Sequence, residues 1–219
     1  MFTLACLDMA GTTVLDDGVV EAAFLTALAE IGYQTAEQTR AFLIQTMGKS
    51  KVEVFTDLLG TQAAGEQGAL AFEAAYAAAV RAQGAGLVPG TAEALGTLRE
   101  MGVTICLTTG FAPATRDLLI ESCGLAPLID LAISPADTSS GRGRPAPDMI
   151  LTAIMATGTT AVSEVVVAGD TSSDIASGLA AGAGMVVGVL TGVHDAPTLR
   201  AAGATAVLSS VAELPTLLG

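Results

Sequence analysis

The stretch FTLACLDMAGTT at Phe2–Thr13 places a carboxylate directly after a short apolar run. Continuous apolar runs, without polar alternation, are typical of strands in a parallel sheet that is buried on both faces. Asp8 ends this run, and Gly11 follows it at a position that favours a turn. We therefore predict a first strand at Phe2–Leu7. Asp8 should then lie at the carboxyl edge of the sheet, where such sheets bind their ligands.

Further apolar runs alternate with helical patterns along most of the chain. This alternation predicts an α/β fold with a doubly wound, mostly parallel sheet that is covered by helices on both faces. The predicted strands are Phe2–Leu7, Val103–Leu107, Leu131–Ser134, Val165–Ala168, Met185–Leu190 and Ala206–Ser209, and the helices between them include Thr91–Met101, Ala114–Cys123, Pro147–Thr157 and Ser172–Ala181.

One region, directly after the first strand, interrupts the alternation with helical periodicity alone. The stretch GTQAAGEQG at Gly60–Gly68 is expected to be a loop, and QGAGLVPG at Gln83–Gly90 a hinge that returns to the core. We predict an inserted α-helical cap domain at 16–86, within a core domain formed by 1–15 and 87–219. The predicted cap helices are Val20–Ile31, Ala36–Thr46, Ser50–Leu59 and Gly65–Gln83.

The composition excludes several classes of partner. The 219 residues carry a net charge of −13, which disfavours a nucleic acid or an anionic membrane as a partner. No apolar stretch is long enough to span a bilayer, and no basic region precedes the first apolar run, so we expect no signal peptide and a cytoplasmic protein. Cys6, Cys106 and Cys123 are too few and scattered for disulfides or zinc, which predicts buried free thiols.

Two further motifs suit an anionic substrate. Thr108-Thr109-Gly110 ends a predicted strand and offers a hydroxyl and a backbone N–H to a phosphoryl oxygen. Arg144 stands directly before Pro145 in GRGRPAPDM and is the better candidate to hold the anion, whereas Arg142 is expected to be a solvated loop residue.

The fourth motif is the most specific. In VVVAGDTSSDIASG at Val165–Gly178, Asp170 follows a buried strand, and Asp174 comes one helical turn later. Carboxylates at this spacing can face one point, and with Asp8 they would form an oxygen-rich site that suits Mg²⁺.

With these four motifs in this order, the chain resembles hydrolases of the haloacid dehalogenase superfamily over its whole length, including the inserted helical cap. The resemblance implies that Asp8 forms an aspartyl-phosphate, and that Thr109 and Arg144 stabilise the phosphoryl group. It also implies that Mg²⁺ is held by Asp8, Asp170, Asp174 and the main-chain carbonyl of Ala10. The further residues expected to bind substrate are Thr12, Gly110, Met47 and Lys49.

Most members of that superfamily carry a second Asp where this chain has Ala10, and that Asp protonates the leaving alkoxide. A different helper is indicated by TMGKSK at Thr46–Lys51, which contains both lysines of the chain. Lysine can act as an amine nucleophile and form a Schiff base with an aldehyde. The electrons of a broken carbon–phosphorus bond would then flow into an enamine, without a proton at position 10.

The resemblance to one branch, the phosphonatases or phosphonoacetaldehyde hydrolases, is close. Their first motif matches Asp8–Thr12, their Arg-Pro pair matches Arg144-Pro145, and their Schiff-base lysine matches Lys51 in MGKSK. The resemblance makes Lys49 a neighbour that could lower the pKa of Lys51. There are two departures: Val54 replaces a histidine one turn after the lysine, and Phe111 replaces a tyrosine.

We therefore expect an enzyme, a Mg²⁺-dependent hydrolase of a small anionic phosphonate or phosphate, most similar to a phosphonoacetaldehyde hydrolase. One alternative is a phosphomonoesterase of the same superfamily, in which another group supplies the proton. Another is a binding protein that has lost turnover, which Ala10 would explain and the intact Asp170/Asp174 pair disfavours. The resemblance also suggests a homodimer formed through the cap.

Overall fold

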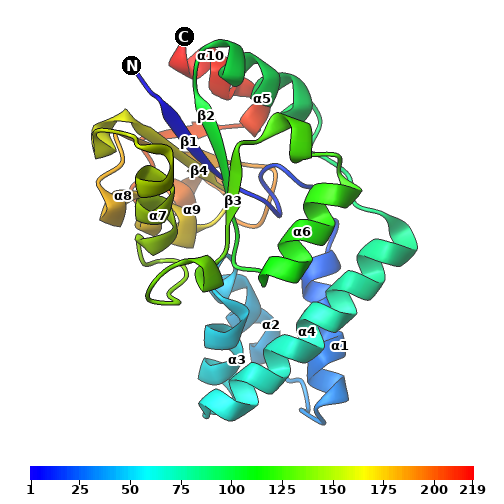
Figure 1. Cartoon of the computed structure of the whole chain (residues 1–219). Helices are drawn as coiled ribbons and strands as arrows, with labels where there is room; N and C mark the ends of the chain where they lie inside the picture. Colours follow the sequence, from blue (N-terminus) through cyan, green and yellow to red (C-terminus); the bar gives the residue numbers. More distant parts are fainter.

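The computed structural model describes residues 1–219, except for the side chain of Glu37. Six strands form one sheet in the order β3-β2-β1-β4-β5-β6, and all neighbouring strands are parallel (Figure 1). The predicted parallel sheet is therefore confirmed. The strands are β1 (Leu4–Asp8), β2 (Thr104–Thr108), β3 (Leu131–Ile133), β4 (Val165–Gly169), β5 (Met185–Val189) and β6 (Ala206–Leu208).

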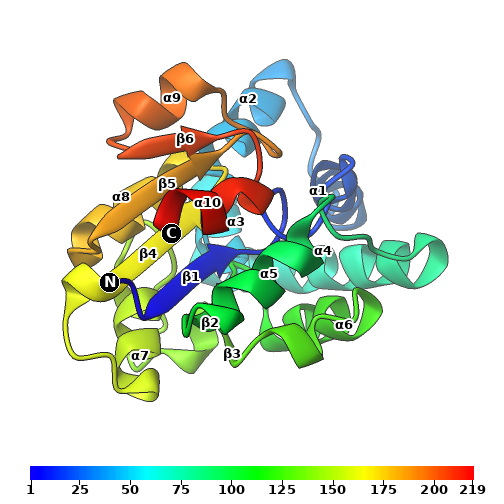
Figure 2. The same ribbon diagram turned by 90° about the horizontal axis from the view of Figure 1, so that it is seen from above.

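Helices cover both faces of the sheet, because successive residues of the strands point to opposite faces. In β1, Ala5 and Leu7 belong to the core cluster under α5 and α10, whereas Leu4 and Cys6 pack with residues of α7. Figure 2 shows α5 and α10 on one side of the sheet and α7 and α8 on the other. The outer helices are α5 (Thr91–Glu100), α6 (Pro113–Ser122), α7 (Asp148–Thr157), α8 (Ser172–Ala181), α9 (Ala196–Ala201) and α10 (Leu214–Leu218).

The cysteines fit this core. Cys6 and Cys106 are buried free thiols in neighbouring strands, as predicted, whereas Cys123 is half-buried. Among the described residues, no helix combines the length and the apolar character that crossing a bilayer requires.

The helices between β1 and α5 lie beyond the carboxyl ends of the strands (Figure 1). The two connections to them run side by side: the Leu15 N–H donates to the Gly86 carbonyl at 2.9 Å, and the Val88 N–H donates to the Thr13 carbonyl at 3.1 Å. This pairing brings the entry and the exit of the segment together. Its helices are α1 (Val19–Glu30), α2 (Glu37–Thr46), α3 (Lys51–Leu59) and α4 (Gln62–Gln83).

The prediction of a loop over the whole of Gly60–Gly68 is wrong, because α4 already begins at Gln62. The side chain of Thr61 caps the helix by accepting a hydrogen bond from a backbone N–H of the first turn. Gly68 lies where α3 approaches closely, and a Cβ at this position would overlap the ring of Phe55. The glycines that indicated a loop therefore permit close helix packing instead.

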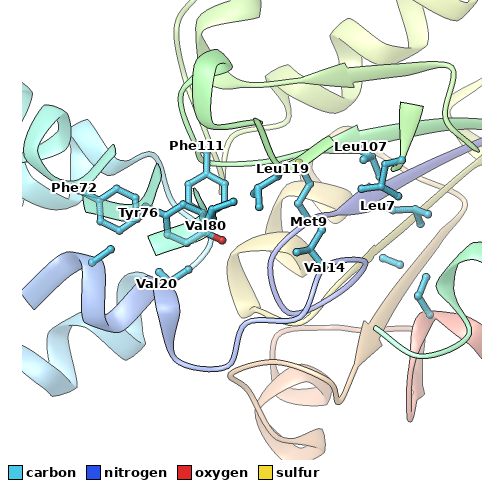
Figure 3. Packing of buried hydrophobic residues seen from close by; sticks show 14 of the residues in the cluster. Leu7, Met9, Val14, Val20, Phe72, Tyr76, Val80, Leu107, Phe111 and Leu119 are labelled. Atoms are coloured by element: carbon cyan, nitrogen blue, oxygen red, sulfur yellow. The ribbon is translucent and has the colours of Figure 1, made fainter. Parts of the chain in front are cut away.

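A cluster of aromatic rings joins α1, α3 and α4 to the end of β2. Phe24 and Phe55 are stacked with ring centroids 4.2 Å apart, and Phe72 continues the cluster. Phe111, which follows β2, lies 4.7 Å from the ring of Tyr76 (Figure 3). Phe111 is thus part of the apolar contact between the helical segment and the sheet.

This cluster predicts a large loss of stability on truncation of Phe55, which is 0% exposed. Phe55→Ala should lower the free energy of unfolding by about 3–5 kcal/mol, because it removes a buried ring and leaves a cavity. The matched control is Leu70→Ala on α4, where the side chain is 72% exposed and the change should stay within about 0.5 kcal/mol. Urea unfolding followed by circular dichroism measures both, and equal losses would contradict the packing described.

Candidate active site

Polar residues of the predicted motifs lie at the carboxyl ends of three neighbouring strands. Asp8 ends β1 and pairs in register with Thr108 at the end of β2. β4 ends at Gly169, so Asp170 follows directly. Because β1 lies between β2 and β4, these positions meet at one edge of the sheet. The structure therefore brings together the motifs that the sequence places far apart.

Three buried carboxylates form the centre of the site. Oxygen atoms of Asp8, Asp170 and Asp174 all lie within 4.8 Å of one another. Asp170 accepts hydrogen bonds from the Val193 N–H at 2.9 Å and from the Thr12 hydroxyl at 3.2 Å. Asp174, in the first turn of α8, accepts from the N–H and the hydroxyl of the N-cap residue Thr171. These bonds fix both carboxylates toward Asp8.

The cluster carries a surplus of negative charge. Burial raises the pKa of Asp8 well above its usual value, against the lowering effect of Arg144, and the other two carboxylates raise it further. Burial also raises the pKa of Asp170, to about 7, and the neighbouring Asp174 adds to the shift. Crowded hard oxygen ligands with surplus negative charge fit a divalent cation such as Mg²⁺.

Arg144 is the cation that the structure places in this cluster. It is buried, and its guanidinium contacts Asp8 through Nη1 and Asp174 through Nε, both at 2.8 Å. Nη2 donates to the hydroxyl of Thr108 at 2.7 Å and to the carbonyl of the same residue at 2.9 Å. Arg142 is exposed and pairs with Asp148, as expected of a loop residue. The two arginines of the motif thus have different environments.

A pocket opens beside Asp8. Ala10, Thr109, Gly110 and Met47 line it, together with Asp8, Arg144 and Asp170. Ala10 brings no acid to this pocket. Thr12 lies behind Asp170, where its hydroxyl donates to the carboxylate, and is not among the lining residues. Lys49 does not line the pocket either, since its Nζ pairs with Glu53 at 3.1 Å.

Lys51, the first residue of α3, lines the same pocket as Asp8. Its side chain is buried, and its Nζ lies 5.1 Å from the ring centroid of Phe72 and 5.5 Å from that of Phe111. Burial lowers the pKa of Lys51 below its usual value, although Glu73 and nearby aspartates favour the charged form. Arg144 adds to the lowering. Lys49, expected to have this effect, has an acidic partner of its own.

The segment that carries both lysines is held against the sheet by two glycines. Gly48 has φ 81°, and a Cβ at this position would lie 2.5 Å from the hydroxyl of Thr171. A Cβ at Gly110 would lie 2.5 Å from the Lys49 carbonyl oxygen. Larger residues would therefore separate α3 from the strand ends, and the pocket between Asp8 and Lys51 would widen.

The comparison with known families agrees with this geometry. Residues 2–182 match the haloacid dehalogenase-like hydrolases. The chain belongs to the haloacid dehalogenase-like hydrolase family. This finding confirms the expected family and the expectation of a hydrolase. Asp8, Thr109, Arg144 and Asp170 belong to the four motifs on which the resemblance was based, and all four residues line the pocket.

Individual proteins that resemble this chain are also named as hydrolases or hydrolase-like proteins. This hydrolase is 29% identical to a phosphonoacetaldehyde hydrolase of Parabacteroides distasonis in an alignment over 154 residues, and the match covers 58% of this chain and 56% of that relative. The match thus spans about half of that relative's length. A hydrolase structure from Pseudomonas syringae has a TM-score of 0.85 at 25% identity, covering 99% of this chain and 97% of that one. A phosphonoacetaldehyde hydrolase-like protein from Oleispira antarctica shares the fold, with a TM-score of 0.83, 22% identity and coverage of 99% and 91%.

The sequence reasoning missed Asp16. The carboxylate lines the pocket with Lys51, and its oxygen accepts the Val20 N–H at the start of α1 at 3.1 Å. Burial raises the pKa of Asp16, against the lowering effects of the Val20 N–H and of Lys51. An Asp four residues before a helical position is a signal for a helix start, but it does not reveal that the carboxylate faces the pocket.

Removal of the Arg144 side chain should leave the negative charge of the three carboxylates uncompensated. Arg144→Ala leaves two buried carboxylates without their partner and should lower the free energy of unfolding by about 3–5 kcal/mol. Millimolar Mg²⁺ should recover more stability in this variant than in the unchanged hydrolase, because a divalent cation supplies the missing charge. Thermal unfolding with and without Mg²⁺ measures both effects.

The matched control is Arg142→Ala, two residues away, where the side chain is 66% exposed. It should change stability by less than about 0.5 kcal/mol and leave the response to Mg²⁺ unaltered. A response to Mg²⁺ that is identical in all three proteins would contradict a cation site at the carboxylates.

Proposed function

We propose that this hydrolase uses Asp8 as the nucleophile on the phosphorus of a small phosphonate, and that Lys51 forms a Schiff base with the carbonyl group of the same substrate. The observation that carries the proposal is that Asp8 and Lys51, from β1 and α3, line one pocket. The lowered pKa of Lys51 supports the role, since an amine must be neutral to attack a carbonyl group. The 29% identity to a phosphonoacetaldehyde hydrolase agrees with it.

The phosphoryl end of the substrate would lie against Arg144 and Thr109. The carboxylates of Asp8, Asp170 and Asp174, with the Ala10 carbonyl, would hold Mg²⁺, which neutralises phosphoryl charge when bound. Arg144 brings a fixed, buried positive charge next to Asp8, which favours an anion without a cost of reorganisation. A chain with a net charge of −13 needs such local positive charge to bind an anionic substrate.

The reaction begins at Lys51. The neutral amine adds to the carbonyl carbon, and uptake of one proton from solvent with loss of water gives an iminium ion. A carboxylate oxygen of Asp8 then bonds to phosphorus while the carbon–phosphorus bond breaks. The electron pair of the broken bond converts the iminium ion into an enamine. Water hydrolyses the aspartyl-phosphate, and protonation and hydrolysis of the enamine release the carbonyl product and free Lys51.

Ala10 is consistent with this route. The electrons of the broken bond are delocalised onto the Schiff-base nitrogen, so no acid is needed beside Asp8 when the bond breaks. A phosphate ester instead expels an alkoxide, which an acid must protonate.

The helical segment would act as a cap domain over the site, with the boundaries 16–86 inserted in a core of 1–15 and 87–219. The paired connections at Leu15–Gly86 and Thr13–Val88 support a shared hinge. The contact of Gly48 with Thr171 supports closure of the cap onto the core.

A phosphomonoesterase is the second candidate, and Asp16 is the observation that favours it. This carboxyl group lines the pocket, and burial raises its pKa, so it could supply the proton that Ala10 cannot. Val54 and Phe111 also favour it, since they depart from the phosphonatase pattern. A protein without turnover is disfavoured because the three carboxylates and Arg144 form an intact cluster.

Borohydride trapping tests the role of Lys51. Reduction in the presence of phosphonoacetaldehyde should inactivate the hydrolase and attach one adduct, which peptide mass spectrometry should locate on Lys51. The rate of trapping should rise with pH, with a midpoint below about 10.4, the pKa of a free lysine, because burial lowers the pKa of Lys51. Lys51→Arg should lose both the adduct and phosphate release, since arginine keeps the charge but forms no imine.

Lys49→Arg is the matched control, because Lys49 lies two residues away and pairs with Glu53. This variant should keep the adduct and most of the activity. Normal cleavage of phosphonoacetaldehyde by Lys51→Arg would sink the Schiff-base mechanism.

Restoring the acid at position 10 tests the account of Ala10. Ala10→Asp should raise the hydrolysis of phosphate monoesters by roughly 10²–10⁴-fold, because it adds a general acid next to Asp8. It should not raise carbon–phosphorus cleavage. Ala10→Asn has nearly the same shape without a transferable proton and should show no such gain. Rapid ester hydrolysis by the unchanged protein, unaffected by either substitution, would assign the acid to another residue.

A further inference from the structure

A second pocket lies next to the one that holds Asp8. Its volume is about 270 Å³, and the volume beside Asp8 is about 30 Å³. The second pocket is enclosed by α1, α2 and α3 and by the segment at 191–193. The space beside Asp8 therefore suits a small group, and the larger space lies on the side of the helical segment.

The two pockets adjoin at Lys51. They share five lining residues: Asp16, Val20, Met47, Lys51 and Val193. A substrate whose phosphorus lies at Asp8 and whose carbonyl carbon lies at Lys51 would bring its next carbon atoms to the border of the second pocket.

The walls of the second pocket are mainly apolar. The buried side chains of Phe24, Leu43 and Val54 line it, and Ile44, which is 46% exposed, lies toward solvent. Among its lining residues, all of which the structure describes, Lys51 is the one cation, whereas Asp16 and Glu21 are acidic. An anionic group would be repelled there, so the phosphonate end belongs at Arg144 and an apolar group in the second pocket.

From this arrangement we infer that the second pocket binds an apolar substituent on the carbonyl carbon of the substrate. The substrate class would be 2-oxoalkylphosphonates with a chain of several carbons, from which cleavage gives a methyl ketone and phosphate. The inference rests on the proposed function for the position of the carbonyl group. The apolar lining and its position next to the anion site are independent of the chemistry at Lys51.

Binding of simple alkylphosphonates tests the pocket without any reaction, because these compounds have no carbonyl group. Calorimetry with the Mg²⁺-loaded protein should show that affinity rises from methyl- to propyl- to hexylphosphonate, by about fourfold for each added methylene that becomes buried. In parallel, phosphate release should be compared between phosphonoacetaldehyde and 2-oxoalkylphosphonates of increasing length, where kcat/KM should rise with length from 2-oxopropyl onward.

Variants on one helix locate the effect. Val54→Trp fills the second pocket and should remove the dependence of affinity on chain length. The matched control is Val52→Trp on the same helix, since Val52 is 39% exposed and does not line this pocket. It should retain the dependence. Because Val54 is buried, Ile44→Glu provides a second variant at an exposed position, and its added negative charge should weaken hexylphosphonate more than methylphosphonate.

The outcomes separate this inference from the proposed function. Equal affinity for methyl- and hexylphosphonate, with phosphonoacetaldehyde still cleaved, would overturn the inference and leave the Schiff-base proposal intact. A chain-length dependence that Val54→Trp or Ile44→Glu removes would support the subsite, even if no carbon–phosphorus bond is cleaved and the proposed function fails.

Discussion

The guanidinium of Arg144 joins parts of the molecule that are distant in sequence. It contacts Asp8 at the end of β1, Thr108 at the end of β2 and Asp174 in α8, and it donates to the Gly48 carbonyl of the helical segment at 3.3 Å. A buried charge is tolerated only where it is paired and hydrogen-bonded, so each of these elements must be in place for the others to be stable. The geometry of the nucleophile and the approach of the helical segment are therefore coupled through one side chain.

The pocket between the sheet and the helical segment has two different environments. At the sheet, charged groups crowd around Asp8 and suit an anion that arrives with a metal ion. At the helices, Lys51 lies beside two aromatic rings, and its burial lowers its pKa and so favours the neutral form. The strand ends supply the charged groups, whereas α3 supplies Lys51 and α4 supplies Phe72, so the two environments meet in one pocket. A substrate with an anionic end and a carbonyl end matches both.

Much of the sheet and of the charged cluster could be predicted from the sequence. Buried parallel strands leave continuous apolar runs, and their ends are marked by the residues that follow, as with Asp8 and Asp170. A carboxylate one helical turn further, Asp174, is fixed by local geometry once Thr171 begins the helix. These predictions depend on short-range periodicity and on the rule that parallel strands present their carboxyl ends at one edge.

What the sequence by itself determined is thus the order of strands and helices and the edge at which the motifs meet. The tertiary structure decided the distant partners: Thr12 donates to Asp170, and Asp16 lines the pocket of Lys51. It also decided that α4 begins at Gln62, three residues before the helix start predicted at Gly65. The physical reason is that hydrogen-bond partners and burial depend on packing between elements far apart in the chain, whereas periodicity and capping depend only on neighbouring residues.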